Sequence, residues 1–494
     1  MNCRFDDDLA RRRGDDLLLI VDSGTVGHFV LRVLWGAAHG HVRVRDADVH
    51  QEDDGKPVRA SPQGALVTRG SPTSWFLTPA LAGLIIVEAI REGGFWKPDA
   101  LVVAVVASIL IVGQLARGVQ DRRSGAVVVS FSLLALWWFL RALSAGPVSS
   151  FLPLGASILG FVGAFVTVRR LTPSHKAAAG LFVASLGAVG ASTGFVGLIW
   201  RWYPMAMPAQ HLWRLSTTLT YADAAGVFLA MSLLVALAGG PRPWMARVAV
   251  CLCVGGLIAT QSRGAFLAFA CGCVLVPWRQ YVLFIAPLLS GLALGVVAVA
   301  TSPSPGAAPV LGGALVAALG VSLARLPVMG RWKWRRREVA LVVVVALGAL
   351  IGTGLLLHAE IALRALAPSD QDRAAEWSAA FHQFVSSPWI GVGPDHLLHF
   401  HAVDGTLASF AHNEYLQVAA DGGLVGAALL ALAVVALARA VRRVDVLTSC
   451  AVGALVCLAI AGLVDFDWHL SFLGLLGGWV AGLAARASPD PEAI

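Results

Sequence analysis

Charged and hydrogen-bonding side chains stand at a few places in or beside long apolar stretches, where a charge is costly and calls for an explanation. Two of them are the arginines Arg263 and Arg373, and a third is His412. The guanidinium group suits two-point binding of phosphate or pyrophosphate, and imidazole suits proton transfer near neutral pH. These residue types predict chemistry on an anionic ligand, with a histidine that could remove a proton from an incoming hydroxyl group.

Each of these positions also has a purely structural interpretation. Arg263 could reach lipid headgroups or cap a helix, and Arg373 could pair with Glu376 one helical turn later. His412 could be a hydrogen-bonding helix cap. A fourth polar group could line a cavity or anchor headgroups, and it consists of Arg214, Tyr221, Asp223, Asp465, Asp467 and His469.

Familiar motifs for nucleotide and metal chemistry are missing from the sequence. There is no glycine-rich phosphate loop and no His-Glu-x-x-His sequence, which argues against an NTPase or a metalloprotease. The Cys-x-Cys pairs that begin at Cys251 and Cys271 lie in apolar runs with no His or acidic residue nearby. Thiols in such runs usually pack as small apolar groups, so we expect no metal there.

The composition excludes a soluble enzyme. Hydrophobic residues make up 57% of the 494 residues and charged residues only 14%, whereas soluble domains carry about 25% charged residues. Too little polar surface remains to cover several soluble cores, so the chain is predicted to be an integral membrane protein. The net charge is +7, and only four of the 37 basic residues are lysines. In a membrane protein this excess sets topology, and no nucleic-acid partner is expected.

Apolar runs long enough to cross a bilayer alternate with short polar joints from Trp75 onward. They predict an all-α integral membrane protein, a polytopic bundle of about 12–14 transmembrane helices. The candidate spans lie near residues 75–90, 99–116, 125–142, 147–168, 177–200, 218–238, 244–261, 264–277, 280–301, 308–326, 338–358, 412–438, 446–464 and 468–485. The predicted organisation is a disordered cytoplasmic extension (1–74), N-terminal transmembrane helices (75–200), a second transmembrane region (201–485) and a cytoplasmic tail (486–494).

Basic residues fall in every second joint, as the positive-inside rule requires. The basic joints contain Arg117, Arg122, Arg123, Arg169, Arg170, Lys176, Arg242, Arg247, Arg279, Arg331, Lys333, Arg335, Arg336, Arg337, Arg439, Arg442 and Arg443. The opposite joints are poor in basic residues, and the stretches 301–309 and 465–469 have none. With this orientation, all four groups of polar residues face the outer side of the membrane.

Two of the outward joints are long, 201–217 and 359–411. In the second, Ser369-Asp370-Gln371-Asp372 matches a capping box, and a helix that begins there places Trp377, Phe381 and Phe384 on one face. Pro388 would end this helix, and residues 391–394 have the composition of a turn. We expect an amphipathic helix that lies in the outer membrane interface.

Several of these segments, in this order, resemble the O-antigen ligase and O-antigen polymerase family of multi-spanning membrane proteins. Residues 214–224 are similar to an early family segment, in which Asn is usual at the position of Asp223. Ser262-Arg263-Gly264-Ala265 resembles the family's SRG motif, and Arg263 to Leu267 fits R-x3-L. The resemblance extends over about residues 200–485.

Two more segments carry the resemblance. Arg373, Trp377 and residues 388–394 are similar to the family's R…W…P-x-x-G-x-G-P stretch. His412-Asn413, followed after nine residues by Gly423-x-x-Gly426, fits the ligase pattern H-[NSQ]-x9-G-x-x-G. The threonines that follow in some ligases are replaced here by alanines, so the acceptor type stays open.

The resemblance implies glycosyl transfer at the outer, periplasmic face of the cytoplasmic (inner) membrane, by a protein with GT-C-like architecture. The donor would be a glycan on undecaprenyl pyrophosphate, and the acceptor a hydroxyl of a glycan, lipid or protein. Arg263 and Arg373 would hold the pyrophosphate, and His412 would be the general base of an inverting reaction. Neither a nucleotide nor a metal ion nor another cofactor would be needed. The implied substrate-binding residues are Arg214, Tyr221, Asp223, Asn413 and Glu414.

Three alternatives to a ligase remain. A polymerase of the same family shares these motifs, although the His-Asn…Gly-x-x-Gly pattern favours a ligase. A transporter or flippase of lipid-linked glycans would also need arginines in the membrane, but it predicts charges near the midplane and an inverted repeat. Here the candidate residues gather at one face, which favours an enzyme. A non-catalytic assembly subunit is the third alternative, because Asp223 departs from the family pattern.

Overall fold

The computed structural model describes residues 72–116, 121–209, 212–303, 305–323, 371–395 and 410–485, which belong to one compact unit. The predicted span 338–358, the predicted tail 486–494 and residues 1–71 of the predicted extension lie outside the described residues.

Helices make up nearly all of the first part of the structure. From the N-terminal side they are α3 (Pro72–Ile90), α4 (Lys97–Leu115), α5 (Arg122–Ala145), α6 (Leu152–Val168), α7 (Pro173–Trp200), α8 (Ala222–Ala236) and α9 (Pro243–Thr260). Short 3-10 turns occur at Glu92–Gly94 (η1), Val148–Phe151 (η2) and Thr217–Leu219 (η3). Between α7 and α8 lie two four-residue strands, β1 (Ala206–Ala209) and β2 (Leu212–Leu215), which pair antiparallel with Met207 opposite Arg214.

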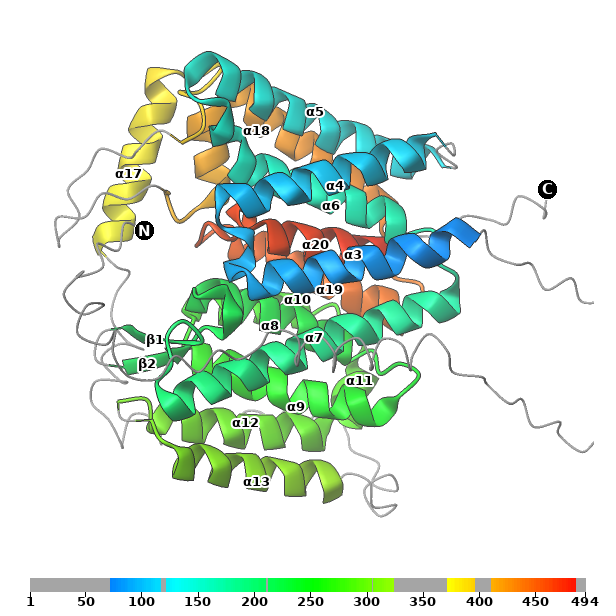
Figure 1. The fold of residues 1–494 in the computed structure, drawn as a ribbon, viewed down its shortest axis with the longest axis vertical. Helices are drawn as coiled ribbons and strands as arrows, with labels where there is room; N and C mark the ends of the chain where they lie inside the picture. Colours follow the sequence, from blue (N-terminus) through cyan, green and yellow to red (C-terminus); the bar gives the residue numbers. More distant parts are fainter. Residues whose placement is uncertain are drawn as a thin grey trace, which may run out of the picture. The chain divides into compact units, whose positions relative to one another are not determined.

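The second part is also helical. It contains α10 (Arg263–Cys273), α11 (Trp278–Leu283), α12 (Ile285–Ala300), α13 (Ala307–Leu323), α17 (Gln371–Ser386), α18 (Glu414–Ala440), α19 (Val446–Ala461) and α20 (Ser471–Ala484). A 3-10 turn, η4 (Asp467–His469), precedes α20. Figure 1 shows α6 and α20 in the middle of the bundle, and every residue of α20 is buried.

Six helices of the described ranges are long and apolar enough to cross a membrane, and they are Lys97–Leu115, Arg122–Ala145, Val148–Val168, Pro173–Trp200, Pro243–Thr260 and Glu414–Ala440. Helices occupy all of the predicted spans except 338–358, which the described residues do not include. Outward-facing apolar side chains, such as Ile109 and Val112 on α4, are about two-thirds exposed (65% and 66%). The chain is thus an all-α polytopic membrane protein, as predicted.

Three details differ from the predictions. The predicted span 264–277 is a helix of only 11 residues, α10, which at about 1.5 Å per residue covers roughly half of a 30 Å bilayer core. The predicted joint 201–217 contains the β1–β2 hairpin, whose four-residue strands are too short to give a periodic pattern. Helix α18 is interrupted at Gly423, where φ is 66° and ψ is −164°.

Side-chain caps define where several helices begin. Ser262 accepts a hydrogen bond from the amide of Ala265 at the start of α10, and Asn413 accepts one from the amide of Leu416 at the start of α18. Asp445 and Thr448 form a capping box at the start of α19. Each cap satisfies an amide that the first helical turn leaves unpaired, so polar residues fix these boundaries within apolar sequence.

The interruption in α18 receives the segment that follows α17, residues 387–395, which we call the docked loop. Backbone amides of Val392 and Gly393 donate to the carbonyls of residues 420 and 421, and those of residues 424 and 425 donate to carbonyls of the loop. A Cβ atom on Gly423 would lie 2.4 Å from the backbone of Trp389. The absence of a side chain at Gly423 thus admits the loop.

Helix α5 supports the docked loop from the other side. Arg141 Nη2 donates to the carbonyl of Gly391 (2.9 Å), and Trp137 Nε1 donates to the carbonyl of Gly422 (3.0 Å). Helix α17, which carries the candidate site residue Arg373, is therefore anchored at its C-terminal end to both α5 and α18.

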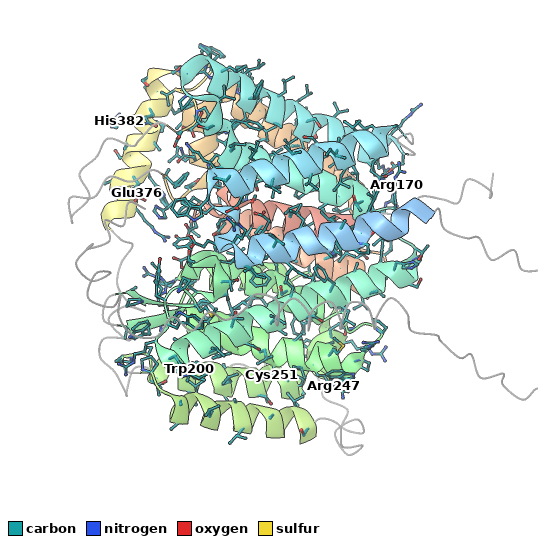
Figure 2. All side chains as sticks on the ribbon, in the orientation of Figure 1. Arg170, Trp200, Arg247, Cys251, Glu376 and His382 are labelled. Carbon is teal, nitrogen blue, oxygen red and sulfur yellow. The ribbon has the colours of Figure 1, made fainter. Side chains whose placement is uncertain are left out.

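The two ends of the bundle differ in the residues they carry. Figure 2 shows Arg170 and Arg247 at one end and Glu376 and His382 at the other. Arg170 and Arg247 belong to joints that the sequence predicts to be cytoplasmic, and Glu376 belongs to a joint predicted to face outward. The candidate site described next lies at the end that carries Glu376.

Candidate functional site

Helix α17 forms where the capping-box pattern predicts it, and it carries Arg373 and Glu376 one turn apart. Arg373 Nη1 donates to the carbonyl of Val464 (2.8 Å), and Nη2 lies 3.8 Å from a carboxylate oxygen of Asp465. Both partners belong to the loop between α19 and α20. The arginine of the outer loop thus reaches a segment about 90 residues further along the chain.

His412 stands immediately before the cap of α18 and contacts the same helix α17. Its Nδ1 donates to Glu376 Oε2 at 2.7 Å, and the Glu376 side chain is buried. Because Nδ1 is used in this way, Nε2 is the ring nitrogen that can accept a proton. The ring also packs edge-on against Phe466, with centroids 5.1 Å apart.

The electrostatic surroundings of His412 favour its protonated form. Burial alone would lower the pKa of His412, but the hydrogen bond to Glu376 and the nearby charge of Asp465 raise it above the ordinary value. A carboxylate bound to Nδ1 stabilises the imidazolium that forms when Nε2 takes a proton. The pair therefore has the arrangement of a general base and the group that orients it.

The backbone around these side chains is constrained. His412 has a φ of 46°, and Gln261, just before Ser262 and Arg263, has a φ of 54°. Thr220, just before Tyr221, has a φ of 60°. Such left-handed conformations are unfavourable for residues with a Cβ atom and often gather at functional sites.

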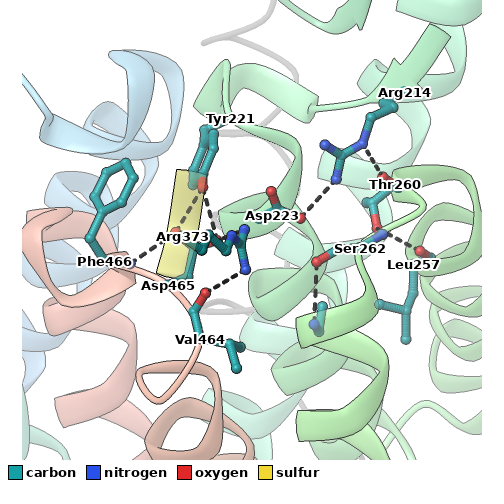
Figure 3. A network of polar contacts seen from close by, with 11 residues as sticks. Arg214, Tyr221, Asp223, Leu257, Thr260, Ser262, Arg373, Val464, Asp465 and Phe466 are labelled. Carbon is teal, nitrogen blue, oxygen red and sulfur yellow. Dashed lines mark hydrogen bonds and ion pairs between the residues drawn. The ribbon is translucent and has the colours of Figure 1, made fainter. Parts of the chain in front are cut away.

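A second set of side chains joins the hairpin to the same loop, as Figure 3 shows. Arg214 Nη2 donates to Asp223 Oδ1 (2.7 Å), and Arg214 Nε donates to the carbonyl of Thr260 (2.8 Å). The hydroxyl of Tyr221 donates to the carboxylate of Asp465, at 2.7 and 2.9 Å from its two oxygens. Asp465 thus links the predicted Tyr221 group to Arg373.

Between these groups is a small open hollow, which we call the recess. It has an empty volume of about 210 Å³, and its lining residues are Asp223, Val227, Ser262, Gly264, Ala265, Arg373, Ala461, Val464, Asp465 and Asp467. The recess combines the SRG segment, the arginine of α17 and the loop before α20. It is the part of the described chain where three of the sequence-predicted polar groups meet.

Arg263 and the residues after His412 are placed differently. Arg263 is the first residue of α10, and its side chain is exposed and not among the residues that line the recess. Asn413 uses its side-chain oxygen to cap α18. Glu414 is fully buried, 3.2 Å from Nδ1 of His469. Asn413 and Glu414 thus already have partners within the protein.

The sequence named Glu376 and Asp465 but did not predict their partners. Glu376 could have paired with Arg373 and instead binds His412, and Asp465, from the fourth polar group, connects Arg373 with Tyr221. The i, i+3 spacing of Arg373 and Glu376 was the available signal, since it puts both side chains on one face of a helix. Among the described residues, no group of three or more His, Cys, Asp or Glu side chains could hold a metal ion.

No curated protein matches the chain. The family model described as O-Antigen ligase matches residues 310–431, a segment that includes Arg373, Glu376 and His412. The matched segment lies within the region, residues 200–485, over which the sequence resembles the O-antigen ligase and polymerase family.

Proposed function

We propose that the protein is a membrane glycosyltransferase that moves a glycan from undecaprenyl pyrophosphate to an acceptor hydroxyl. The observation that carries the proposal is the 2.7 Å contact between His412 and Glu376, on the helix that also carries Arg373. A general base and a pyrophosphate-binding arginine are the two components that such a transfer requires. The match of residues 310–431 to the O-Antigen ligase family model supports a ligase-like activity of this kind.

In this mechanism His412 Nε2 takes the proton of the acceptor hydroxyl while its oxygen attacks the anomeric carbon. The bond between that carbon and the pyrophosphate oxygen breaks, so the configuration inverts and undecaprenyl pyrophosphate leaves with the electron pair. Glu376 holds the imidazole through Nδ1 and stabilises the imidazolium. The energy is already stored in the pyrophosphate linkage, so we propose that neither a nucleotide nor a metal ion takes part.

The arginines have separate roles in this proposal. Arg373 stabilises the negative charge that develops on the leaving pyrophosphate, and Arg263 binds the same group from the exposed start of α10. Arg214, Tyr221 and Asp223 shape the substrate site through the network around Asp465. Asn413 and Glu414 act indirectly, by fixing the start of α18 next to His412.

The setting proposed for the reaction is the outer face of the cytoplasmic membrane. Basic joints such as those of Arg170 and Arg247 lie at the opposite end of the bundle from Glu376, and the positive-inside rule puts basic joints in the cytoplasm. The lipid-linked donor would enter from the bilayer. The acceptor would be a hydroxyl of a glycan, a lipid or a protein.

The test is a transfer assay with purified full-length protein, a pool of undecaprenyl-pyrophosphate glycans and candidate acceptors. We expect release of undecaprenyl pyrophosphate together with one glycosylated product. A single added glycan identifies a ligase, and a ladder of repeat units identifies a polymerase. Donor that crosses the membrane of a proteoliposome without being cleaved would reject the proposal and identify a transporter.

A further inference from the structure

The recess contains one carboxyl group that the surrounding network leaves unpaired. Asp467 is fully buried and lines the recess, and neither of its carboxylate oxygens has a hydrogen-bond partner among the described residues. Asp223, in contrast, is bound by Arg214, and Asp465 is bound by Tyr221. A buried polar group without a partner is destabilising, so an unpaired carboxyl at a recess indicates a partner that arrives with a ligand.

The charges around the recess are unsuited to pyrophosphate itself. Three aspartates line it, Asp223, Asp465 and Asp467, and Arg373 is the one cation among its described lining residues. A pyrophosphate in this position would face carboxylates at short range, where like charges repel strongly. An uncharged ligand with several hydroxyl groups meets no such penalty, and its hydroxyls can both donate and accept hydrogen bonds.

The state of Asp467 fits such a ligand. Burial, together with the neighbouring Asp465 and Asp223, raises the pKa of Asp467 well above its ordinary value. A protonated carboxyl group can donate one hydrogen bond and accept others, which matches the hydroxyl groups of a sugar.

We propose that the recess binds the sugar ring joined directly to the pyrophosphate of the donor, with Asp467 hydrogen-bonded to one of its hydroxyl groups. The pyrophosphate then lies outside the recess, against the exposed part of Arg373. This inference rests on the proposed function. It adds that the recess recognises the sugar of the donor and that the exposed part of Arg373 recognises the pyrophosphate. Arg373 contacts both parts, because it lines the recess and remains about a third exposed (31%).

The test compares two lipids on the full-length protein in lipid nanodiscs. One is undecaprenyl pyrophosphate without a sugar, and the other is the glycan-bearing donor that supports transfer in the assay above. For Asp467→Ala we expect the Kd of the glycan-bearing donor to rise about 10- to 100-fold, the loss of one strong hydrogen bond. The Kd of undecaprenyl pyrophosphate should not change, because the pyrophosphate does not contact Asp467.

Two controls separate this role from a structural one. The unfolding temperature of Asp467→Ala should stay constant or rise, since the change removes an unpaired buried carboxyl. Asp99→Ala removes another buried carboxyl with one unpaired oxygen, at the start of α4 and outside the recess, and should leave both Kd values unchanged. Arg373→Lys should raise the Kd of both lipids.

The outcomes distinguish failure of the sugar site from failure of the proposed function. If Asp467→Ala weakens the binding of both lipids equally, or of neither, the proposed sugar site is wrong while donor binding stands. Glycan-donor binding that disappears with EDTA would mean that the recess holds a cation, which also overturns the sugar site. If the wild-type protein binds neither lipid, the proposed function itself fails.

Discussion

Two side chains on one turn of α17 contact the two chemically distinct parts of the site. Glu376 binds the proposed general base, and Arg373 binds the loop that carries Asp465. The sequence predicted helix α17, and it identified Arg263 and Arg373 as candidates because charged residues near apolar spans are rare. It could not predict which carboxylate His412 contacts, because that depends on how α17 lies across the start of α18.

Arg373→Lys tests the guanidinium group. Lysine keeps the charge but cannot bind two oxygens in a plane. It also cannot contact the carbonyl of Val464 and lie next to Asp465 at the same time, as the two guanidinium nitrogens do. We expect the transfer rate to fall by at least about tenfold, as for the loss of one charge-stabilising contact. Arg247→Lys, at the opposite end of the bundle, is the matched control. Unchanged transfer by Arg373→Lys would remove Arg373 from the site.

Glu376→Gln tests the orientation of the base through pH dependence. The rate should fall as the pH drops through the pKa of His412, because a protonated imidazole cannot accept a proton. Since Glu376 raises this pKa, glutamine should move the acid limb of the profile to lower pH and also lower the maximum rate. The pH profile of kcat/KM measures both effects. An acid limb that stays in place would show that another group titrates.

At the scale of elements, the docked loop explains how α17 is held in position. The spacing of Pro388, Gly391 and Gly393 predicted a turn, and a turn is present. Its partner could not be predicted, because the backbone bonds to residues 420 and 421 join segments separated by a long stretch of chain. The same limit applies to Arg141 on α5, which binds the carbonyl of Gly391 and carries no local sequence signal for this role.

Gly423→Ala tests this docking. At φ of 66° and ψ of −164° an alanine is strained, and its Cβ atom would lie 2.4 Å from the backbone of Trp389. We expect a loss of about 1–3 kcal/mol in the free energy of unfolding, with a parallel loss of transfer. Gly113→Ala in α4 meets no atom within 4 Å and should be neutral or slightly stabilising. Thermal unfolding in detergent compares the two, and equal stability would exclude the docking account.

At the scale of the whole molecule, the apolar runs predicted the long helices, but they did not predict the short helix α10 or the strands β1 and β2. Runs of about 20 apolar residues are explained by the thickness of the bilayer alone. The short α10 and the β1–β2 pair both carry contacts next to the recess, since Ser262 caps α10 and Arg214 of β2 reaches Asp223. These two elements position polar groups at the recess.

Thiol labelling of intact cells tests the proposed orientation. In a variant whose native cysteines are replaced, a cysteine at Leu463, between α19 and α20, should react with a membrane-impermeant reagent. A cysteine at Val444, between α18 and α19, should react only after the cells are broken. Both native side chains are well exposed, at 43% and 75%, and both lie in loops between helices. The reverse pattern would invert the topology and move the site to the cytoplasm.

The central claim is that His412 is the base of a glycosyl transfer, and the most direct measurement is release of undecaprenyl pyrophosphate by purified wild-type protein and His412→Ala. We predict a loss of about 100-fold or more in the single-turnover rate for His412→Ala. His382→Ala should leave the rate unchanged, because that exposed histidine of α17 lies outside the site. Release at the wild-type rate by a folded His412→Ala protein would contradict the account.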